Sequence, residues 1–374
     1  MTNTTNTTAG AYKPESIFQR RLKNFKKIKR AYYSLLLIGI LYLLSFLAPL
    51  LINGRALIVR YNGETYFPAM GDLFGGVFPT AHREASYFGQ THVFGVEQHG
   101  EANYRELKKQ FAAEGKGNWV LMPPYPYSPI ENLLGQLDGK PPTKPDSKHI
   151  LGTDNRGRDV FARIAYGFQI SISFAALVTI LSYILSVVIG GLLGYFGGRV
   201  DIYGLRLIEI FSNIPFLFMV MILVSFLKPS FTLLVVLLVI LGGWIGMSYL
   251  VRGEFYREKA RDYVSAAHAL GASDTSIMFK HILPNALTPI ITYAPFSMIG
   301  NISALVGLDF LGFGLRPPTP SWGELINQGL SEDISYWWLI ISPLFMMFFT
   351  LNTITFIGEG VRQAFDPRDY SKIE

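Results

Sequence analysis

The chain has 374 residues, of which half are hydrophobic and 16% are charged. A soluble protein of this length would fold as two or three domains with a larger charged fraction, whereas the long apolar runs of this chain need a bilayer. The composition therefore excludes an ordinary soluble enzyme. The sequence has no cysteine, so disulfides, catalytic thiolates and cysteine metal ligands are excluded, and any part outside the membrane is held together by packing alone.

Six stretches without Asp, Glu, Lys or Arg are long enough to cross a bilayer as a helix, which takes about 20 residues. We therefore predict an all-α membrane protein with six transmembrane helices. The first stretch is longer than the apolar core of a signal peptide, and no small-residue cleavage motif follows it, so we interpret it as a retained helix. The six stretches are Ala31–Ile52, Gln169–Gly198, Ile210–Leu227, Pro229–Val251, Ile282–Leu308 and Ile334–Gly358.

The formal charge of +6 raises the question of nucleic acid, but the placement of the basic residues indicates membrane orientation instead. Seven Lys and Arg residues crowd positions 20–30, directly before the first stretch. Because such residues are retained on the cytoplasmic side, the amino terminus is predicted inside, and six crossings return the carboxyl terminus there. No DNA- or RNA-binding motif accompanies the charge, so we expect no nucleic-acid partner.

Three parts lie outside these stretches. Residues 1–15 are polar and of low complexity, which predicts disorder. Residues 53–149 separate the first two helices and form an extracytoplasmic insertion whose ten basic side chains balance ten acidic ones. Patterning predicts a small α+β domain there, with strands at Ala56–Tyr61 and Asn118–Met122 and a helix at Glu101–Ala113. The third part is the cytoplasmic segment at positions 252–284.

This cytoplasmic segment has the pattern of two helices around a glycine. The first is predicted over Glu254–Leu270, and Gly271 ends it. The second begins near Ser273, whose hydroxyl can cap the following turn, and ends at Leu283 before a proline. On pattern alone, the segment either folds back on the membrane helices or presents a small, smooth patch to a partner. The patch consists of Ala266, Ala267 and Leu270.

The stretch VSAAHALGASDTSIMFKHILPNALTPI resembles the EAA loop of permease subunits in ATP-binding-cassette importers, in which it forms the coupling helix. Two alanines, a glycine four residues on and a later Leu-Pro match at the family's spacing, and the ending at positions 281–285 resembles the peptide-transport branch. The family's usual glutamate is replaced by Ser265, which puts any ionic contact of that carboxylate in doubt. The resemblance implies contact with an ATPase subunit through Ser265, Ala266, Ala267, Leu270, Gly271, Ile277, His281, Leu283 and Pro284.

Two further stretches support the same branch. Leu151–Ser173 resembles the segment before the first core helix of dipeptide and oligopeptide permeases, and Gly307–Trp322 resembles the loop before their last helix. The first stretch can also be interpreted as an interfacial turn, with Arg158 and Arg163 anchored at lipid headgroups. The resemblance covers about residues 150–367 and indicates the second permease subunit of peptide importers, with the type I importer fold. Its matched residues in the first stretch are Gly152, Thr153, Asp154, Gly157, Arg158, Asp159 and Gly167.

The insertion is rich in Tyr, Phe and Pro, notably at positions 66–68 and 123–129. In this it resembles the permeases of importers that take up microcin C and related peptides in Gram-negative bacteria. Aromatic residues with prolines can form a stiff surface for a binding protein or a peptide, although they more often serve as core and turn residues.

The chain carries no sign of its own energy source or catalytic centre. The six stretches hold no charged side chain, the sequence has no phosphate-binding G-x-x-x-x-G-K-[ST] loop, and its six histidines are scattered. We therefore expect no enzyme activity and no cofactor or metal on this chain, with ATP and Mg bound by partner subunits. Pro and Gly inside the stretches serve packing and kinks or act as hinges. Polar side chains that can line a pathway are Ser212, Asn213, Asn301 and Asn352.

These features together predict a permease in the inner membrane of a bacterium. Its expected partners are a sister permease, two ATPase subunits, an extracytoplasmic peptide-binding protein and membrane lipid. The predicted parts are a basic tail (1–30), the first helix (31–52), the insertion (53–149), the core (150–367) with the coupling loop at 252–284, and a tail (368–374). The alternatives are an importer of other small cargo such as a metal complex, a membrane scaffold for an extracytoplasmic partner, and, least favoured, a lipid-directed enzyme.

Overall fold

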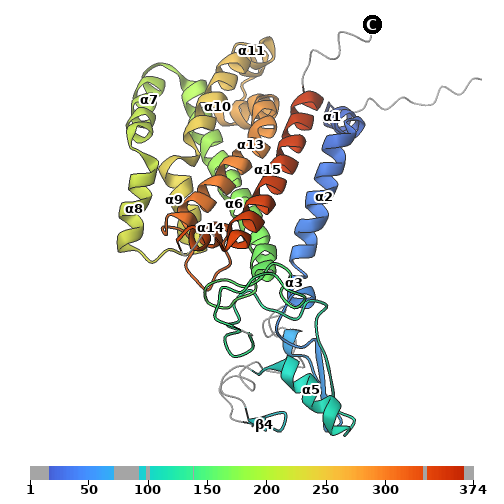
Figure 1. Ribbon diagram of the computed structural model, residues 1–374. Helices are drawn as coiled ribbons and strands as arrows, with labels where there is room; N and C mark the ends of the chain where they lie inside the picture. Colours follow the sequence, from blue (N-terminus) through green and yellow to red (C-terminus); the bar gives the residue numbers. More distant parts are fainter. Residues whose placement is uncertain (1–16, 71–91, 98–101, 138, 332–334, 366–374) are drawn as a thin grey trace, which may run out of the picture.

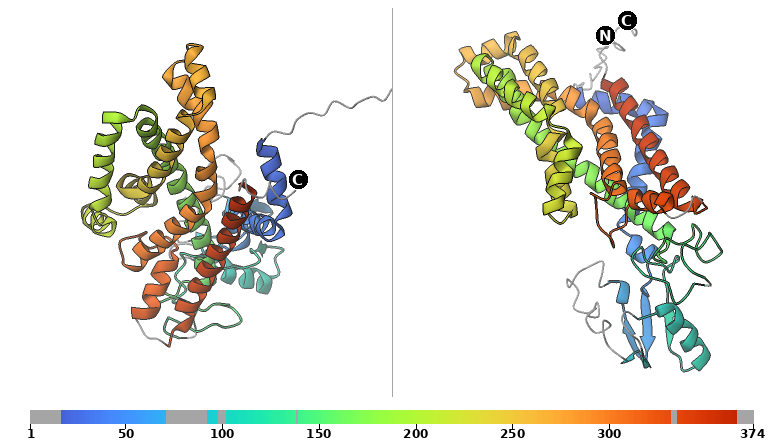
Figure 2. Two further views of the ribbon diagram at one scale, coloured as in Figure 1. Left: turned by 90° about the horizontal axis from the view of Figure 1, so that it is seen from above. Right: turned by 60° about the vertical axis from the view of Figure 1, so that its left-hand side comes forward.

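The computed structural model describes residues 17–70, 92–97, 102–137, 139–331 and 335–365. The segment predicted to be disordered (1–15), the predicted tail at 368–374 and the first residue of the sixth stretch, Ile334, lie outside these ranges. Most described residues are helical, and the long helices form a bundle from which the insertion projects at one end (Figure 1). The start of α1 (Ile17–Lys27) and the end of α15 (Trp337–Phe365) lie at the opposite end (Figure 2).

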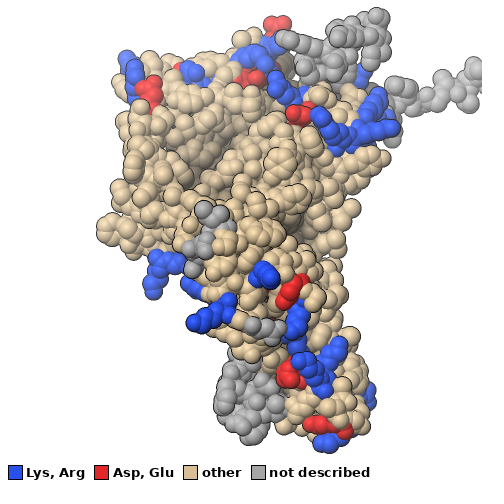
Figure 3. Space-filling view, in the orientation of Figure 1, with Lys and Arg blue, Asp and Glu red and all other residues tan. Residues whose placement is uncertain are grey.

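Three helices are each long and apolar enough to cross a membrane. They are α6 (Val160–Phe196), α15, and the continuous helix that α12 (Asp274–Ser276) and α13 (Leu283–Phe310) form with the π-helical turn between them. Up to three more spans arise if each of three bent helix pairs counts as one. On the face shown in Figure 3, a broad belt without charged residues separates the two charged ends, as expected of a protein that crosses a bilayer.

Three of the helix pairs are bent, at positions that include the proline and glycine residues expected to give kinks or hinges. The chain bends by 98° between α1 and α2 (Lys29–Ser45), by 72° between α7 (Gly198–Asn213) and α8 (Phe216–Phe226), and by 50° within the pair that ends with α10 (Ile245–Lys259). The predicted helix Ile210–Leu227 is therefore wrong as one element.

Proline and glycine explain where these bends fall. Ile214 is extended because a residue before proline avoids the helical conformation, and Pro215 follows it at the break between α7 and α8. In the last pair, α9 (Phe231–Leu238) passes through a π-helical turn, Val239–Gly243, which ends in a Gly-Gly pair. The first predicted stretch is also interrupted: α2 ends at Ser45, and a short α3 (Ala48–Leu51) follows.

Helix α6 lies at the centre of the bundle and packs along α10 through small residues. A Cβ atom on Gly190 would lie 2.5 Å from the carbonyl oxygen of Ser248, and one on Gly194 would lie 2.6 Å from that of Arg252. Small residues permit this close approach between membrane helices, where packing rather than hydrophobic burial drives association. The other side of α6 shares a buried apolar core with α13, α15 and α14 (Trp322–Ser331), in which Trp322 is fully buried.

The insertion is a small α+β unit, as the patterning predicts. A three-stranded antiparallel sheet has the order β2 (Glu64–Tyr66), β1 (Ile58–Tyr61), β5 (Trp119–Leu121), and α5 (Tyr104–Glu114) packs on it. A second, two-stranded antiparallel sheet consists of β3 (His92–Val93) and β4 (Val96–Glu97). The shared core consists of Ala56, Val59, Phe94, Ala102, Tyr104, Leu107, Phe111 and Val120.

Candidate functional site: the coupling segment and the base of α6

The predicted coupling segment lies at the end of the bundle opposite the insertion (Figure 1). Its first helix is not continuous: α10 ends at Lys259, Arg261 is extended, and α11 (Asp262–Ala269) starts anew. The prediction of one helix over Glu254–Leu270 is therefore wrong. The break turns α11 so that Val264 and Ala267 are buried in the apolar core formed with α6, α10 and α13, a tertiary gain that local pattern does not show.

Gly271 ends α11, as predicted. Its φ of +78° lies in the left-handed region, where a side chain would be strained. The hydroxyl of Ser273 then accepts a hydrogen bond from the amide of Ser276, which confirms it as a helix cap.

The second helix does not stop before Pro284, contrary to the prediction. A π-helical turn over Ile277–Ile282 leads directly into α13, which contains Pro284 in its first turn. In a regular α-helix the proline ring would clash with the carbonyl four residues earlier, and the wider turn lies where this clash would occur. As a result, the coupling segment is continuous with a membrane-spanning helix.

The predicted coupling residues separate by exposure into three groups. One of the exposed residues is Leu270, whose side chain at the tip of α11 is 88% exposed. The interpretation of Ala266, Ala267 and Leu270 as one patch is wrong for Ala267, which points inward and is 7% exposed. His281 and Leu283 are half-buried. Ser265, Ala266, Leu270, Gly271 and Pro284 are exposed, and Ala267 and Ile277 are buried.

Tyrosine side chains that the sequence reasoning missed bind α11 and its neighbours to the bundle. From α6, the hydroxyl of Tyr195 donates to Asp274 Oδ1 at 2.6 Å, and the ammonium of Lys259 donates to the backbone carbonyl of the same tyrosine. From α11, the hydroxyl of Tyr263 donates to Glu258 Oε2 at 3.0 Å and accepts from the Asn285 amide at 3.3 Å. Burial, followed by the bond to Glu258, raises the pKa of Tyr263, although the bond from Asn285 opposes this. The segment is therefore held to α6, α10 and α13 together.

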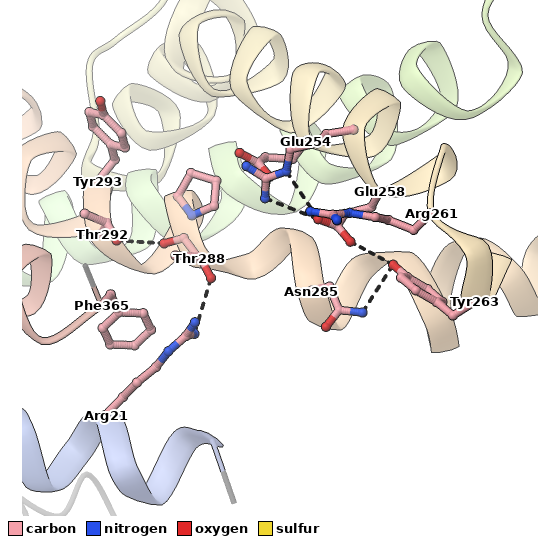
Figure 4. Close-up of a pocket in the computed structure, with 12 residues that line it drawn as sticks. Arg21, Glu254, Glu258, Arg261, Tyr263, Asn285, Thr288, Thr292, Tyr293 and Phe365 are labelled. Atoms are coloured by element: carbon pink, nitrogen blue, oxygen red, sulfur yellow. Dashed lines mark hydrogen bonds and ion pairs between the residues drawn. The ribbon is translucent and has the colours of Figure 1, made fainter. Parts of the chain in front are cut away.

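Beside the coupling segment lies a groove of about 670 Å³ (Figure 4). Its floor is α13, and its walls come from α10 and α11 on one side and from α1 and α15 on the other. Arg21 on α1 donates to the hydroxyl of Thr288 on α13 at 3.3 Å and so closes one edge. The lining residues are Arg21, Glu254, Arg257, Glu258, Arg261, Tyr263, Asn285, Thr288, Pro289, Thr292, Tyr293 and Phe365.

At the other end of the bundle, the matched stretch before α6 forms a buried cluster of charges. The Arg158 guanidinium donates to Asp154 Oδ2 at 2.7 Å and to Glu324 Oε1 at 3.1 Å. Arg163 also donates to Glu324. Because both arginines are at most 2% exposed, the interpretation that they anchor at lipid headgroups is wrong, although Asp154 does form the predicted turn. Sequence reasoning missed Glu324, which lies 161 residues after Arg163.

A second buried group joins this region to the insertion. Asp159 caps α6 by accepting from the amide of Ala162, and its other oxygen accepts from the Tyr125 hydroxyl at 2.7 Å and contacts His149 Nδ1 at 2.8 Å. Burial, reinforced by the neighbouring carboxylate, raises the pKa of Tyr125. Among the described residues, no group of three or more His, Cys, Asp or Glu side chains is placed to hold a metal ion. The contacts of Asp159 with Tyr125 and His149 join the start of α6 to the insertion.

Contacts in the structure explain one glycine of the first matched stretch, Gly167, and one aspartate of the second, Asp309. A Cβ on Gly167 would lie 2.9 Å from the indole of Trp322, whose Nε1 donates to the Ile164 carbonyl. Asp309, at the end of α13, accepts from the Leu315 amide at 2.6 Å and from the Ser321 hydroxyl. Gly167 is therefore required by packing, and Asp309 holds the loop before α14.

Comparison with known proteins is consistent with this geometry. Residues 186–368 match the family described as the inner membrane component of binding-protein-dependent transport systems. The chain is 38% identical to the inner membrane ABC transporter permease protein YejE of Escherichia coli (strain K12), over 93% of this chain and 96% of that protein. It is 36% identical to the peptidoglycan transport system permease protein YejE of Agrobacterium fabrum, over 94% and 93%. The dipeptide transport system permease protein DppC of Bacillus subtilis is 35% identical over 60% of this chain and 70% of its own length.

The chain therefore belongs to the family of inner membrane components of binding-protein-dependent transport systems, the permease subunits of ABC transporters.

Proposed function

We propose that this chain is the second permease subunit of an ATP-driven importer that carries peptides, microcin C-like peptides among them, by alternating access. The observation that carries the proposal is the coupling segment: an 88% exposed leucine at the tip of α11, a left-handed glycine after it, and a direct continuation into α13. Relatives that are 35% identical over about 60% of this chain are named dipeptide and oligopeptide transport system permease proteins, which supports peptides as cargo.

Six membrane spans are the topology we propose, with each of the three bent pairs counted as one span. The basic residues of α1 and the coupling segment share one end of the molecule, which supports a cytoplasmic position for both termini in the bacterial inner membrane (Figure 3). The insertion at the other end is then extracytoplasmic. We retain the proposed parts: a tail (1–30), the first span (31–52), the insertion (53–149), the core (150–367) and a tail (368–374).

The proposed partners are a sister permease, two ATPase subunits that bind ATP and Mg, and an extracytoplasmic peptide-binding protein. In this assembly the exposed residues Ser265, Ala266, Leu270, Gly271 and Pro284, with His281 and Leu283 beside them, contact an ATPase subunit. The buried Ala267 and Ile277 hold the segment to the bundle. Because hydrogen bonds tie the segment to α6, α10 and α13, closure of the ATPases would move these helices as a rigid body.

Affinity purification from native membranes tests the assembly. We expect a tagged chain to bring down a second permease and an ATPase with a phosphate-binding loop. Leu270→Asp should remove the ATPase and peptide uptake while the chain remains in the membrane, because an acid replaces the apolar contact. The matched control, Leu134→Asp, changes an exposed leucine of the insertion and should keep the ATPase. Recovery of the chain alone, in a detergent that preserves related complexes, would favour the scaffold alternative.

A further inference from the structure

Helix α1 has one face that packs against the bundle and another that carries positive charge outward. Its 11 residues contain five basic side chains and no acidic one. Phe25 is 6% exposed and packs in the apolar core that includes α15. Lys26 and Lys27, and Lys29 at the start of α2, are exposed, and Leu22 adds an exposed apolar side chain one turn before Lys26. The basic cluster over α1 stands out at one corner of the molecule (Figure 3).

The direction of α1 relative to α2 suits a helix that lies along a membrane surface. The helix axis turns by 98° into α2, so if α2 crosses the bilayer, α1 lies along its cytoplasmic surface. A short helix in this plane with lysines and an apolar side chain fits a surface of anionic headgroups, which attracts each nearby Lys or Arg. A zwitterionic surface offers no such net attraction.

On the side that faces the bundle, α1 and the start of α2 contact two core helices, α13 and α15. The guanidinium of Arg21 lies 4.6 Å from the ring centre of Phe365 on α15 and donates to Thr288 on α13. Arg30 pairs with Glu359 on α15 at 2.8 Å. Arg21 therefore joins α13 to α15 beside the groove in Figure 4. A shift of α1 alters the contacts that Arg21 makes with these two helices.

We propose that α1 binds anionic phospholipid headgroups of the cytoplasmic leaflet through Lys26, Lys27 and Lys29, and that this contact regulates transport through the Arg21 bridge to α13 and α15. The lipid contact rests on the proposed membrane orientation, and the regulation rests on the proposed transport function. It specifies a lipid class and a regulatory route, beyond the anchoring of the chain in a bilayer.

Lipid preference can be measured directly because the chain has no cysteine. A bimane label on Leu22→Cys, with the whole complex in nanodiscs, reports nearby brominated lipid through quenching. At equal bromine content, brominated phosphatidylglycerol should quench at least about twofold more than brominated phosphatidylcholine. Lys26→Gln, Lys27→Gln and Lys29→Gln together should abolish the difference. The same charge change in the insertion, Lys108→Gln, Lys109→Gln and Lys116→Gln, should leave it intact. Equal quenching by the two lipids in the unaltered chain would overturn the proposal.

Transport in proteoliposomes tests whether the lipid contact regulates uptake. Peptide uptake should rise with the phosphatidylglycerol fraction, and Arg21→Gln should remove that rise while the lipid preference of the bimane label persists. Uptake that is active but independent of phosphatidylglycerol would overturn the regulatory route alone. Loss of uptake in every lipid, with the bimane preference intact, would count against the proposed transport function and against regulation, and would leave the lipid site standing.

Discussion

The hydroxyl of Tyr195 and the carboxylate of Asp274 lie 2.6 Å apart, although 79 residues separate them in the chain. Tyr195 is 3% exposed near the end of α6, and Asp274 begins the continuous helix that becomes α13. This bond joins the central helix of the bundle to the segment that we propose contacts the ATPase. It is therefore a direct link between the coupling segment and the core.

Tyr195→Phe tests that link. Removing a hydrogen bond to a carboxylate weakens the packing of the segment by about 1.5–3 kcal/mol, so we expect fewer peptides imported per ATP hydrolysed. Tyr183→Phe is the matched control, because its hydroxyl bonds Ser297 and so joins α6 to α13 at two positions that both lie outside residues 252–284. The ratio of uptake to ATP hydrolysis in proteoliposomes is the measurement. An unchanged ratio in Tyr195→Phe would mean that the bond does not transmit movement.

Gly271→Val should uncouple ATP hydrolysis from uptake while the complex still assembles. A β-branched residue at φ +78° is strained by roughly 1–2 kcal/mol, which reorients Leu270 at the tip of α11. Gly253→Val is the control, since that glycine lies within α10 with a right-handed backbone, and an added Cβ would meet no other side chain or packed segment within 4 Å. Normal peptide uptake by Gly271→Val would refute the coupling assignment.

Glu324→Ala should destabilise the chain strongly. The change leaves the guanidinium groups of Arg158 and Arg163 buried, with Asp154 as their one remaining ion-pair partner among the residues that the structure describes. Breaking a buried pair costs about 3–5 kcal/mol. Glu106→Ala removes the partner of Lys109 in an exposed pair and should change stability by less than about 1 kcal/mol. Thermal unfolding in detergent, followed by tryptophan fluorescence, compares the two. Equal unfolding temperatures would contradict the assignment of a stabilising role to the cluster.

Asp146→Asn should alter the pH dependence of stability in acid. Burial opposes ionisation of Asp146, but hydrogen bonds from the amides of His149 and Lys148 prevail and lower its pKa. A lowered pKa in the folded state adds stability above the usual aspartate range, near 4, and this stability is lost as the pH falls through the folded value. The unfolding temperature of the variant should therefore lie below that of the unaltered chain at pH 7, with the gap closing toward pH 3. A gap that persists in acid would show that the ionised carboxylate is not the source of the stability.

Local signals in the sequence were sufficient for much of this protein. Three of the uncharged runs overlap the three helices that are each long and apolar enough to cross a membrane, because the backbone of an apolar segment in lipid must satisfy its own hydrogen bonds. The alternation of residues in the insertion located its strands and α5, and Gly271 marked the end of α11 because only a glycine adopts that backbone conformation freely. The family resemblance rested on short motifs of the same local kind.

The tertiary structure alone decided the features that depend on distant partners. The chain is not helical between α10 and α11, and this break lets Ala267 pack in the apolar core beside the start of α13. The arginines before α6 are buried because Glu324 reaches them from α14, and no spacing rule connects positions so far apart. Periodicity records which residues share one helix face, whereas complementary charge and shape between helices arise only when the chain has folded.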